Sequence, residues 1–236
     1  LHPRVRRQRQ MCIRDSIDSE SRNRMLALEA QHPEMLFPLA GLHPTSVYEN
    51  YKAELAQVEK ALGNHTFYGI GECGIDLYWD KRYYREQIKA FEHQLGIAKE
   101  TGLPVIIHSR DSLEVIFEVL KKHPYTRGIL HCFPGNAAEA RQAIDMGYLL
   151  GIGGVVTFKK SQMADTLREI GPANIVLETD SPYLTPVPFR GKRNESSYIP
   201  LIAQKIAELT GLETKKIEEI TTQNALNLFN LQCENV

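Results

Sequence analysis

The chain has 236 residues, 42% of them hydrophobic, so it is long enough to bury a large core in one domain. Its 28 Lys and Arg residues balance 29 Asp and Glu residues, and a net charge of −1 argues against a surface that coats nucleic acid along its whole extent. Any polyanion must therefore bind to a local basic patch.

The sequence also limits the location of the protein. No apolar run approaches the roughly 18 residues of a membrane span, so we expect no contact with a membrane. The four cysteines lack the paired spacing of a zinc site or a disulfide framework, and we expect reduced thiols and a cytoplasmic protein. These cysteines are Cys12, Cys73, Cys132 and Cys233.

The first segment, residues 1–16, is rich in arginine. Its first 14 residues contain five arginines and no acid, and they show no apolar face at helical spacing. We expect a non-native or disordered segment, with a targeting peptide as the weaker alternative. Residues 17–236 are then predicted to form a single domain.

From Ser19 onward, helical and strand patterns alternate. The predicted helices cover residues 19–31, 51–62, 82–101, 112–123, 137–146, 161–170, 197–210 and 215–229. The predicted strands cover residues 36–42, 68–71, 104–108, 127–130, 148–156 and 174–179. This alternation predicts right-handed crossovers and a parallel sheet, either open and doubly wound or closed into a barrel.

Four of the apolar runs end in side chains that can bind a metal. Glu72 follows its run between glycines that leave room for close approach, and we expect it in a loop at the end of the strand. His108, His131 and Asp180 follow three later runs. Any one of them alone would be an ordinary strand-end residue, but four at equivalent positions favour a shared site. Because they come from several strands, the pattern favours a barrel.

Nucleotide-cofactor and serine-hydrolase functions are disfavoured by the motifs that the sequence lacks. No Gly-x-Gly-x-x-Gly opens a helix, and neither a phosphate-binding Gly-Lys-Ser loop nor a Gly-x-Ser-x-Gly elbow occurs.

The motifs that are present resemble the TatD family of metal-dependent deoxyribonucleases. They are Gly-Leu-His-Pro (41–44), Gly-Glu-Cys-Gly-Ile-Asp (71–76), His-Ser-Arg-Asp (108–111), His-Cys-Phe (131–133), Glu-Thr-Asp-Ser-Pro-Tyr-Leu (178–184), Arg-Gly-Lys-Arg-Asn (190–194) and Asn-Ala-Leu-Asn-Leu-Phe (224–229). The resemblance covers residues 17–231. It implies an α/β fold, a TIM (β/α)8 barrel of the amidohydrolase type, with two metal ions at the carboxyl ends of its strands.

The resemblance also implies roles for single residues. Glu72 would bridge the two ions, His108 and His131 would hold one of them, and Asp180 would hold the other. Imidazole and carboxylate ligands accept Mg²⁺, Mn²⁺ or Zn²⁺, so the identity of the metal stays open. Glu72 and Asp180 are the expected catalytic residues, with Asp180 orienting or deprotonating the attacking water.

The implied activity is hydrolysis of DNA phosphodiester bonds, as a 3′-5′ exodeoxyribonuclease acting on single strands or 3′ ends, with no obligate protein partner. The residues expected to bind substrate are His43, Arg110, Lys159, Arg190, Arg193 and Asn194. An ordinary solvated basic loop is the alternative for residues 190–193, and a hydrogen-bonded turn is the alternative for His43. For Asp111 we favour a helix cap over a hydrogen bond to a histidine ligand.

One family feature is missing. The family carries a His-x-His pair on its first strand, and none occurs in this sequence. We therefore expect an N-terminally truncated barrel that lacks its first two strands, binds about one metal ion tightly and has little activity. The alternatives are another amidohydrolase-type enzyme acting on a small ester, amide or aminoacyl-tRNA, and a non-catalytic remnant that binds polyanions.

Overall fold

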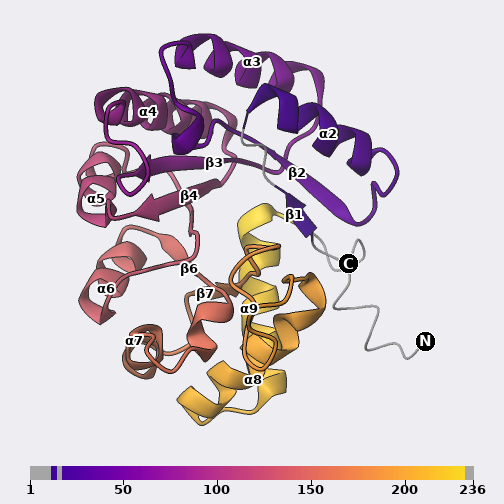
Figure 1. The fold of residues 1–236 in the computed structure, drawn as a ribbon, viewed down its shortest axis with the longest axis vertical. Helices are drawn as coiled ribbons and strands as arrows, with labels where there is room; N and C mark the ends of the chain where they lie inside the picture. Colours follow the sequence, from indigo (N-terminus) through magenta and orange to yellow (C-terminus); the bar gives the residue numbers. More distant parts are fainter. Residues whose placement is uncertain (1–11, 15–17, 232–236) are drawn as a thin grey trace. The chain divides into compact units, whose positions relative to one another are not determined.

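The computed structural model describes residues 12–14 and 18–231. The chain forms two compact units, which are described in turn: within the described residues, the first unit ends at Gly128 and the second extends from Ile129 to Leu231. Figure 1 shows the elements of both units in sequence colours.

The first unit is built on four parallel strands that neighbour one another in chain order. They are β1 (Cys12–Arg14), β2 (Leu36–Ala40), β3 (Gly69–Asp76) and β4 (Val105–Arg110). The helices between and after them are α2 (Ser19–Glu29), α3 (Tyr51–Asn64), α4 (Tyr84–Thr101) and α5 (Leu113–Lys121), with a short 3-10 helix, η1 (Pro44–Ser46), after β2. Parallel strands joined by helices are the arrangement that the alternating pattern predicted.

The apolar side chains of β2, β3 and β4 form much of the core of the first unit. Leu39, Ile70, Ile75 and Ile107 have no exposed surface, as expected for strands of a parallel sheet. Helix α4 contributes Phe91, which is also fully buried. Burial of each such side chain stabilises the fold by roughly 1.5–3 kcal/mol.

Strand β1 was not expected, because it lies in the Arg-rich segment. Residues 12–14 pair in parallel with β2, from Cys12 opposite Leu36 to Arg14 opposite Pro38. A run of three residues is too short to show alternation, so the sequence pattern could not reveal this strand. The rest of that segment, residues 1–11 and 15–16, lies outside the described residues, as does Cys233.

The second unit starts within β5 (Gly128–Leu130) and continues the alternation. Its further elements are α6 (Ala137–Asp145), β6 (Tyr148–Ile152), η2 (Gly154–Thr157), α7 (Met163–Ile170), β7 (Ile175–Leu177), η3 (Ser196–Tyr198), α8 (Ile199–Thr210) and α9 (Thr214–Phe229). Strands β6 and β7 are parallel, with Gly151 opposite Val176. Leu150, Ile202 and Ile217 are fully buried and place the core between these strands and the last two helices.

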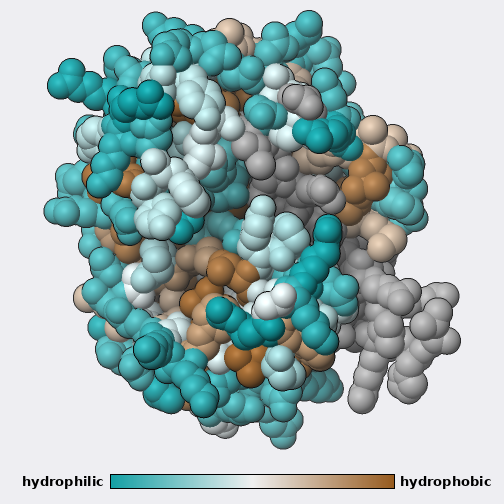
Figure 2. All heavy atoms as spheres, viewed as in Figure 1, coloured by the Kyte–Doolittle hydropathy of each residue, from teal (hydrophilic) through white to brown (hydrophobic). Residues whose placement is uncertain are grey.

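All six predicted strands and all eight predicted helices are present, with bounds that differ by a few residues. Hydrophilic side chains cover most of the face drawn in Figure 2, in keeping with helices that turn their charged sides to solvent. Cys73 and Cys132 are reduced thiols, not disulfide-bonded. In the described part of the chain, no helix combines the length and the apolar character needed to cross a bilayer.

Candidate functional site

Glu72 lies inside β3, and the prediction that it follows the end of a strand was wrong. Between the pairs Ile70–Val105 and Cys73–Ile107, β3 advances by one residue more than β4, which is a β-bulge. Gly71 makes this possible: its φ is 146°, and a Cβ there would lie 2.7 Å from the backbone oxygen of Ile106. The bulge interrupts the ladder at Glu72, so its side chain is presented from within the strand.

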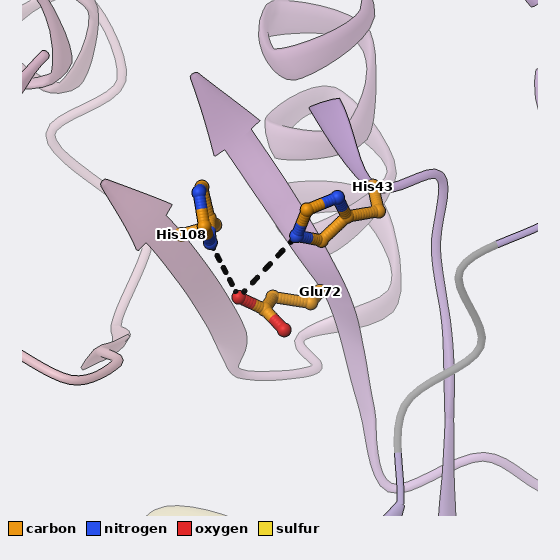
Figure 3. A group of neighbouring side chains, drawn as sticks. All are labelled: His43, Glu72 and His108. Carbon is orange, nitrogen blue, oxygen red and sulfur yellow. Dashed lines mark hydrogen bonds and ion pairs between the residues drawn. The ribbon is translucent and has the colours of Figure 1, made fainter. Parts of the chain in front are cut away.

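Two imidazoles face the Glu72 carboxylate. Its Oε1 lies 2.9 Å from Nδ1 of His108, in β4, and 3.7 Å from Nε2 of His43, which follows β2. Figure 3 shows both rings pointing toward this carboxylate. The three side chains are only 13–18% exposed. We call His43, Glu72 and His108 the first-unit triad.

A second carboxylate orients His108. Asp76 ends β3 and is almost completely buried, and its Oδ2 lies 2.9 Å from Nε2 of His108. Its Oδ1 accepts the backbone N–H groups of Tyr78 and Trp79, at 2.9 and 3.1 Å. Carboxylates only accept, so without a cation Asp76 at Nε2 and Glu72 at Nδ1 both favour a proton on the ring. With a cation held between Nδ1 and Glu72, the proton of a neutral His108 would belong on Nε2, toward Asp76, and Nδ1 would offer its lone pair to the ion. Asp76 belongs to the motif of residues 71–76, but no role was predicted for it.

His43 is held in an equivalent way by Thr45. The hydroxyl oxygen of Thr45 lies 2.6 Å from Nδ1 of His43 and can accept its proton, which leaves the lone pair on Nε2. The backbone N–H of Thr45 also donates to Nδ1, at 3.2 Å, in the other tautomer. The hydrogen-bonded turn that was the alternative for His43 is therefore present, and the same ring also faces Glu72.

Two buried glutamines of α4 position these segments. Gln94 accepts the N–H of Leu42 at 2.8 Å and donates to its carbonyl oxygen at 3.2 Å, which fixes the backbone just before His43. Gln87 accepts the N–H of Asp76 at 2.9 Å. The two glutamines are seven residues apart, so they share one face of the helix. Helix α4 thus supports both edges of the site.

The pKa values of Asp76 and His108 follow from their burial and their hydrogen bonds. Burial alone would raise the pKa of Asp76, but the hydrogen bonds from His108 and from two backbone N–H groups hold this pKa below its ordinary value. Burial alone would lower the pKa of His108, but Asp76 and Glu72 together raise it. Without a metal, the site therefore favours a negative Asp76 beside a proton on His108.

The first-unit triad fits one divalent cation. The ligand atoms of His43, Glu72 and His108 all lie within 4.8 Å of one another. Two imidazole nitrogens and one carboxylate oxygen are a donor set of catalytic zinc sites, and such sites keep a further position open for water or substrate. The separations of 2.9 and 3.7 Å bracket the ~3.4 Å expected between ligands of a tetrahedral ion with bonds of about 2.1 Å. His43 was predicted to contact substrate, and the geometry adds it to the possible metal ligands.

The other two predicted ligands lie in the second unit. Nδ1 of His131 lies 2.8 Å from Oε2 of Glu178, and its Nε2 lies 3.6 Å from Oδ1 of Asp180. Glu178 also accepts the N–H of Cys132, at 2.6 Å. We call His131, Glu178 and Asp180 the second-unit triad. Glu178 was not predicted as a site residue, although it stands two positions before Asp180 in the same motif.

The backbone around the second-unit triad is specialised. Cys132 and Asp180 have positive φ values of 43° and 54°, which are uncommon for residues with a side chain and recur at functional sites. A Cβ on Gly151 would collide with the Glu178 carboxylate. Glycine at this position of β6 therefore leaves the space that Glu178 occupies.

The predicted substrate-binding residues fall into different environments. Arg110 ends β4, with its guanidinium 4.0 Å from the ring centre of Tyr78. Arg190 lies 3.7 Å over the ring of Phe158. Lys159 and Arg193 are exposed. These four side chains keep their cationic groups at the surface, as phosphate contacts require.

Asn194 and Asp111 differ from what was predicted. Asn194 is 1% exposed, and its amide donates to the carbonyl oxygens of Thr179 and Tyr183, both at 2.6 Å. It holds the loop after β7 together and does not face solvent. Asp111 is not the cap of the following helix: α5 has Ser112 as its N-cap residue, and Asp111 has a positive φ of 53°.

The comparisons with known proteins decide the family. The family described as TatD related DNase matches residues 4–230. The chain belongs to the TatD family. It is 39% identical, over 201 residues, to the "uncharacterized metal-dependent hydrolase YabD" of Bacillus subtilis, covering 84% of this chain and 79% of that protein. It is 34% identical, over 230 residues, to the metal-dependent hydrolase TatD of Mycobacterium tuberculosis, covering 93% and 84% of the two chains.

Structural similarity agrees with this assignment. The crystal structure of the TatD homologue YjjV from Escherichia coli matches with a TM-score of 0.87 and 29% sequence identity, covering 93% of this chain and 86% of that chain. The predicted α/β fold of the TIM-barrel, metal-dependent hydrolase type is thereby confirmed. The TatD chain described here is a metal-dependent hydrolase, and the first-unit triad is where its geometry best accommodates a metal.

Proposed function

We propose that this TatD protein hydrolyses phosphodiester bonds of DNA, as a 3′-5′ exonuclease acting on single-stranded ends. The observation that carries the proposal is the first-unit triad, in which two imidazoles and a carboxylate converge at 2.9 and 3.7 Å with His108 oriented by the buried Asp76. A divalent ion bound there would polarise a phosphate oxygen and lower the pKa of a bound water.

The protein's own groups prepare that chemistry. With an ion bound, Asp76 would hold the His108 proton on Nε2 and the Thr45 hydroxyl could hold the His43 proton on Nδ1, which would leave one lone pair of each ring for the ion. Such orientation fixes the ligands before substrate arrives, and no reorganisation is then needed during the reaction. Asp180, in the second unit, stays a proposed catalytic residue, and its carboxylate is 35% exposed, so water can reach it.

Exposed cations support a phosphate-bearing substrate. Arg110 lies two positions beyond His108 on β4, and Lys159, Arg190 and Arg193 lie on loops of the second unit. Each can pair with a phosphate oxygen, and Arg can do so through two parallel hydrogen bonds. The near-zero net charge of the chain makes these local cations the natural contacts for a polyanion.

The test is hydrolysis of end-labelled oligonucleotides by metal-stripped protein supplied with Mg²⁺, Mn²⁺ or Zn²⁺. A 5′ label should yield a ladder of shortened strands, and a 3′ label should be released at once as a mononucleotide. Glu72→Gln should lower the rate about 100-fold or more, which corresponds to ~2.7 kcal/mol of transition-state stabilisation.

The matched control is Glu59→Gln. Glu59 also pairs with a histidine, His93, at 2.7 Å, but both side chains are about half exposed on the surface. This variant should keep the wild-type rate. Wild-type hydrolysis by Glu72→Gln, or activity on a small ester such as p-nitrophenyl acetate with none on any phosphodiester, would refute the proposed function.

A further inference from the structure

Two exposed aromatic side chains follow the first-unit triad in sequence. Tyr78 and Trp79 are 55% and 69% exposed, and their rings meet edge to face with centroids 5.0 Å apart. Burial of a large aromatic side chain is energetically favourable. Two adjacent exposed rings therefore mark a surface that can bind a partner. Neither residue has a role in the metal site described above.

A guanidinium completes this surface. Arg110 lies 4.0 Å from the ring centre of Tyr78 and 5.4 Å from that of Trp79. We call Tyr78, Trp79 and Arg110 the aromatic platform. Aromatic rings combined with a cation are the features by which proteins bind single-stranded nucleic acid, since bases stack on the rings and the cation pairs with the backbone.

The aromatic platform is tied to the first-unit triad through a single carboxylate. Asp76 accepts the backbone N–H groups of Tyr78 and Trp79 with Oδ1 and holds His108 with Oδ2. Arg110 and His108 lie on the same strand, two positions apart. The rings and the metal ligands therefore keep a fixed relation within this unit.

Space for a ligand lies beside the rings. A groove of about 340 Å³ is lined by Asp76 and Trp79 together with Pro44, Tyr48 and Tyr83. This volume falls within the range of about 300–1,000 Å³ that is typical of small-molecule sites. Three of the nine side chains that line the groove are aromatic, so a flat ring entering it meets further aromatic faces.

We propose that the aromatic platform stacks an unpaired nucleobase of a single-stranded nucleic acid whose phosphate lies at the first-unit triad. The inference rests on the proposed function, because it assigns the base next to the phosphate that is cleaved. A paired base has both faces covered in the duplex and cannot stack on these rings. The platform thus accounts for a preference for single-stranded ends without any reading of base identity.

The experiment measures binding without cleavage, in EDTA. Trp79 is the only tryptophan of the chain, so its fluorescence reports on this position directly. The probes are an oligothymidylate of eight nucleotides and an abasic strand of the same length and charge. The oligothymidylate should quench Trp79 and the abasic strand should not. With a dye-labelled oligothymidylate, Trp79→Ala should bind about 5- to 100-fold more weakly, while Trp79→Phe should retain most of the affinity.

Tyr125→Ala is the matched control. Tyr125 is 79% exposed and also has a cation near its ring, Lys99 at 5.4 Å, but it precedes β5 and belongs to neither the first-unit triad nor the aromatic platform. Its affinity should equal that of the wild type. Equal binding of the abasic strand and the oligothymidylate, or unchanged affinity of Trp79→Ala, would overturn the proposal.

The two proposals fail separately. If wild-type protein cleaves DNA but Trp79→Ala binds it normally, the platform is refuted and the phosphodiesterase function stands. If Trp79 recognises bases in EDTA but no metal supports cleavage, the platform stands and the proposed function is refuted.

Discussion

Replacing Asp76 by asparagine should weaken metal binding although Asp76 is not one of the proposed ligands. Oδ1 of Asp76 accepts the backbone N–H groups of Tyr78 and Trp79, so the asparagine would place its amide oxygen at that position. The amide nitrogen would then face Nε2 of His108, where Oδ2 now lies at 2.9 Å. Two donors cannot share that position, so the His108 proton should move to Nδ1, the atom that faces Glu72.

The expected losses of metal affinity and stability follow from the interactions that Asp76→Asn removes. Removing the carboxylate that orients a histidine ligand typically costs 10- to 100-fold in metal affinity, or about 1.4–2.7 kcal/mol. The metal-free protein should also lose up to about 1.5–3 kcal/mol of stability, the range for a hydrogen bond to a charged group. The lowered pKa of Asp76 supports a loss of stability, because it indicates that the fold stabilises the carboxylate despite its burial.

The assay is a calorimetric titration of metal-free protein with Zn²⁺ at pH 7.5, with unfolding in urea measured alongside. Asp80→Asn is the matched control. Asp80 lies four residues further along, its side chain is 36% exposed and it pairs with Arg82 at 2.7 Å, so its substitution should leave the metal affinity unchanged. Equal affinities of wild type and Asp76→Asn would refute the argument that Asp76 fixes the His108 tautomer.

Three further results are expected. Arg193→Ala should raise KM for oligonucleotides and reduce the slope of log affinity against log salt by about 0.7 if it contacts one phosphate; an unchanged slope would leave a solvated loop residue. Gly151→Ala should lower the free energy of unfolding in urea by about 1–3 kcal/mol, because the new Cβ collides with the glutamate of the second-unit triad. Gly63→Ala in α3 is the control and should be neutral or stabilising, because the space around its Cβ is open. In metal-free protein, the contribution of Asp76 to the free energy of unfolding should be lost as pH falls below 3.8 through its lowered pKa. The contribution of His108 should be lost as pH rises above 6.5 through its raised pKa. A melting temperature that does not change with pH would contradict both expectations.

The sequence revealed most of the fold because its helices and strands are strongly patterned. Apolar spacing located α4, and Gly102, with a positive φ of 71°, ends that helix as a left-handed cap. The apolar runs also pointed to the metal-capable residues. They misplaced the ends of β3 and β4, because a strand that is buried on both faces can continue through polar residues such as Glu72 and His108.

The residues that support the site were harder to predict from the sequence. Gln87 and Gln94 occupy inward positions of α4, and a polar side chain on the apolar face of a helix was the signal available for them. Asp76 and Glu178 act through histidines that are far away in sequence, 32 and 47 residues respectively. No local pattern encodes such pairs, because they arise only when parallel strands bring their residues together.

The central claim is that the first-unit triad holds the catalytic metal, and a crystal soaked in Mn²⁺ tests it most directly. An anomalous difference map should show an ion within about 2.3 Å of Nε2 of His43, Oε1 of Glu72 and Nδ1 of His108. Glu72→Gln crystals should lose that peak. An ion bound only by the second-unit triad, with no density among these three atoms, would contradict the account.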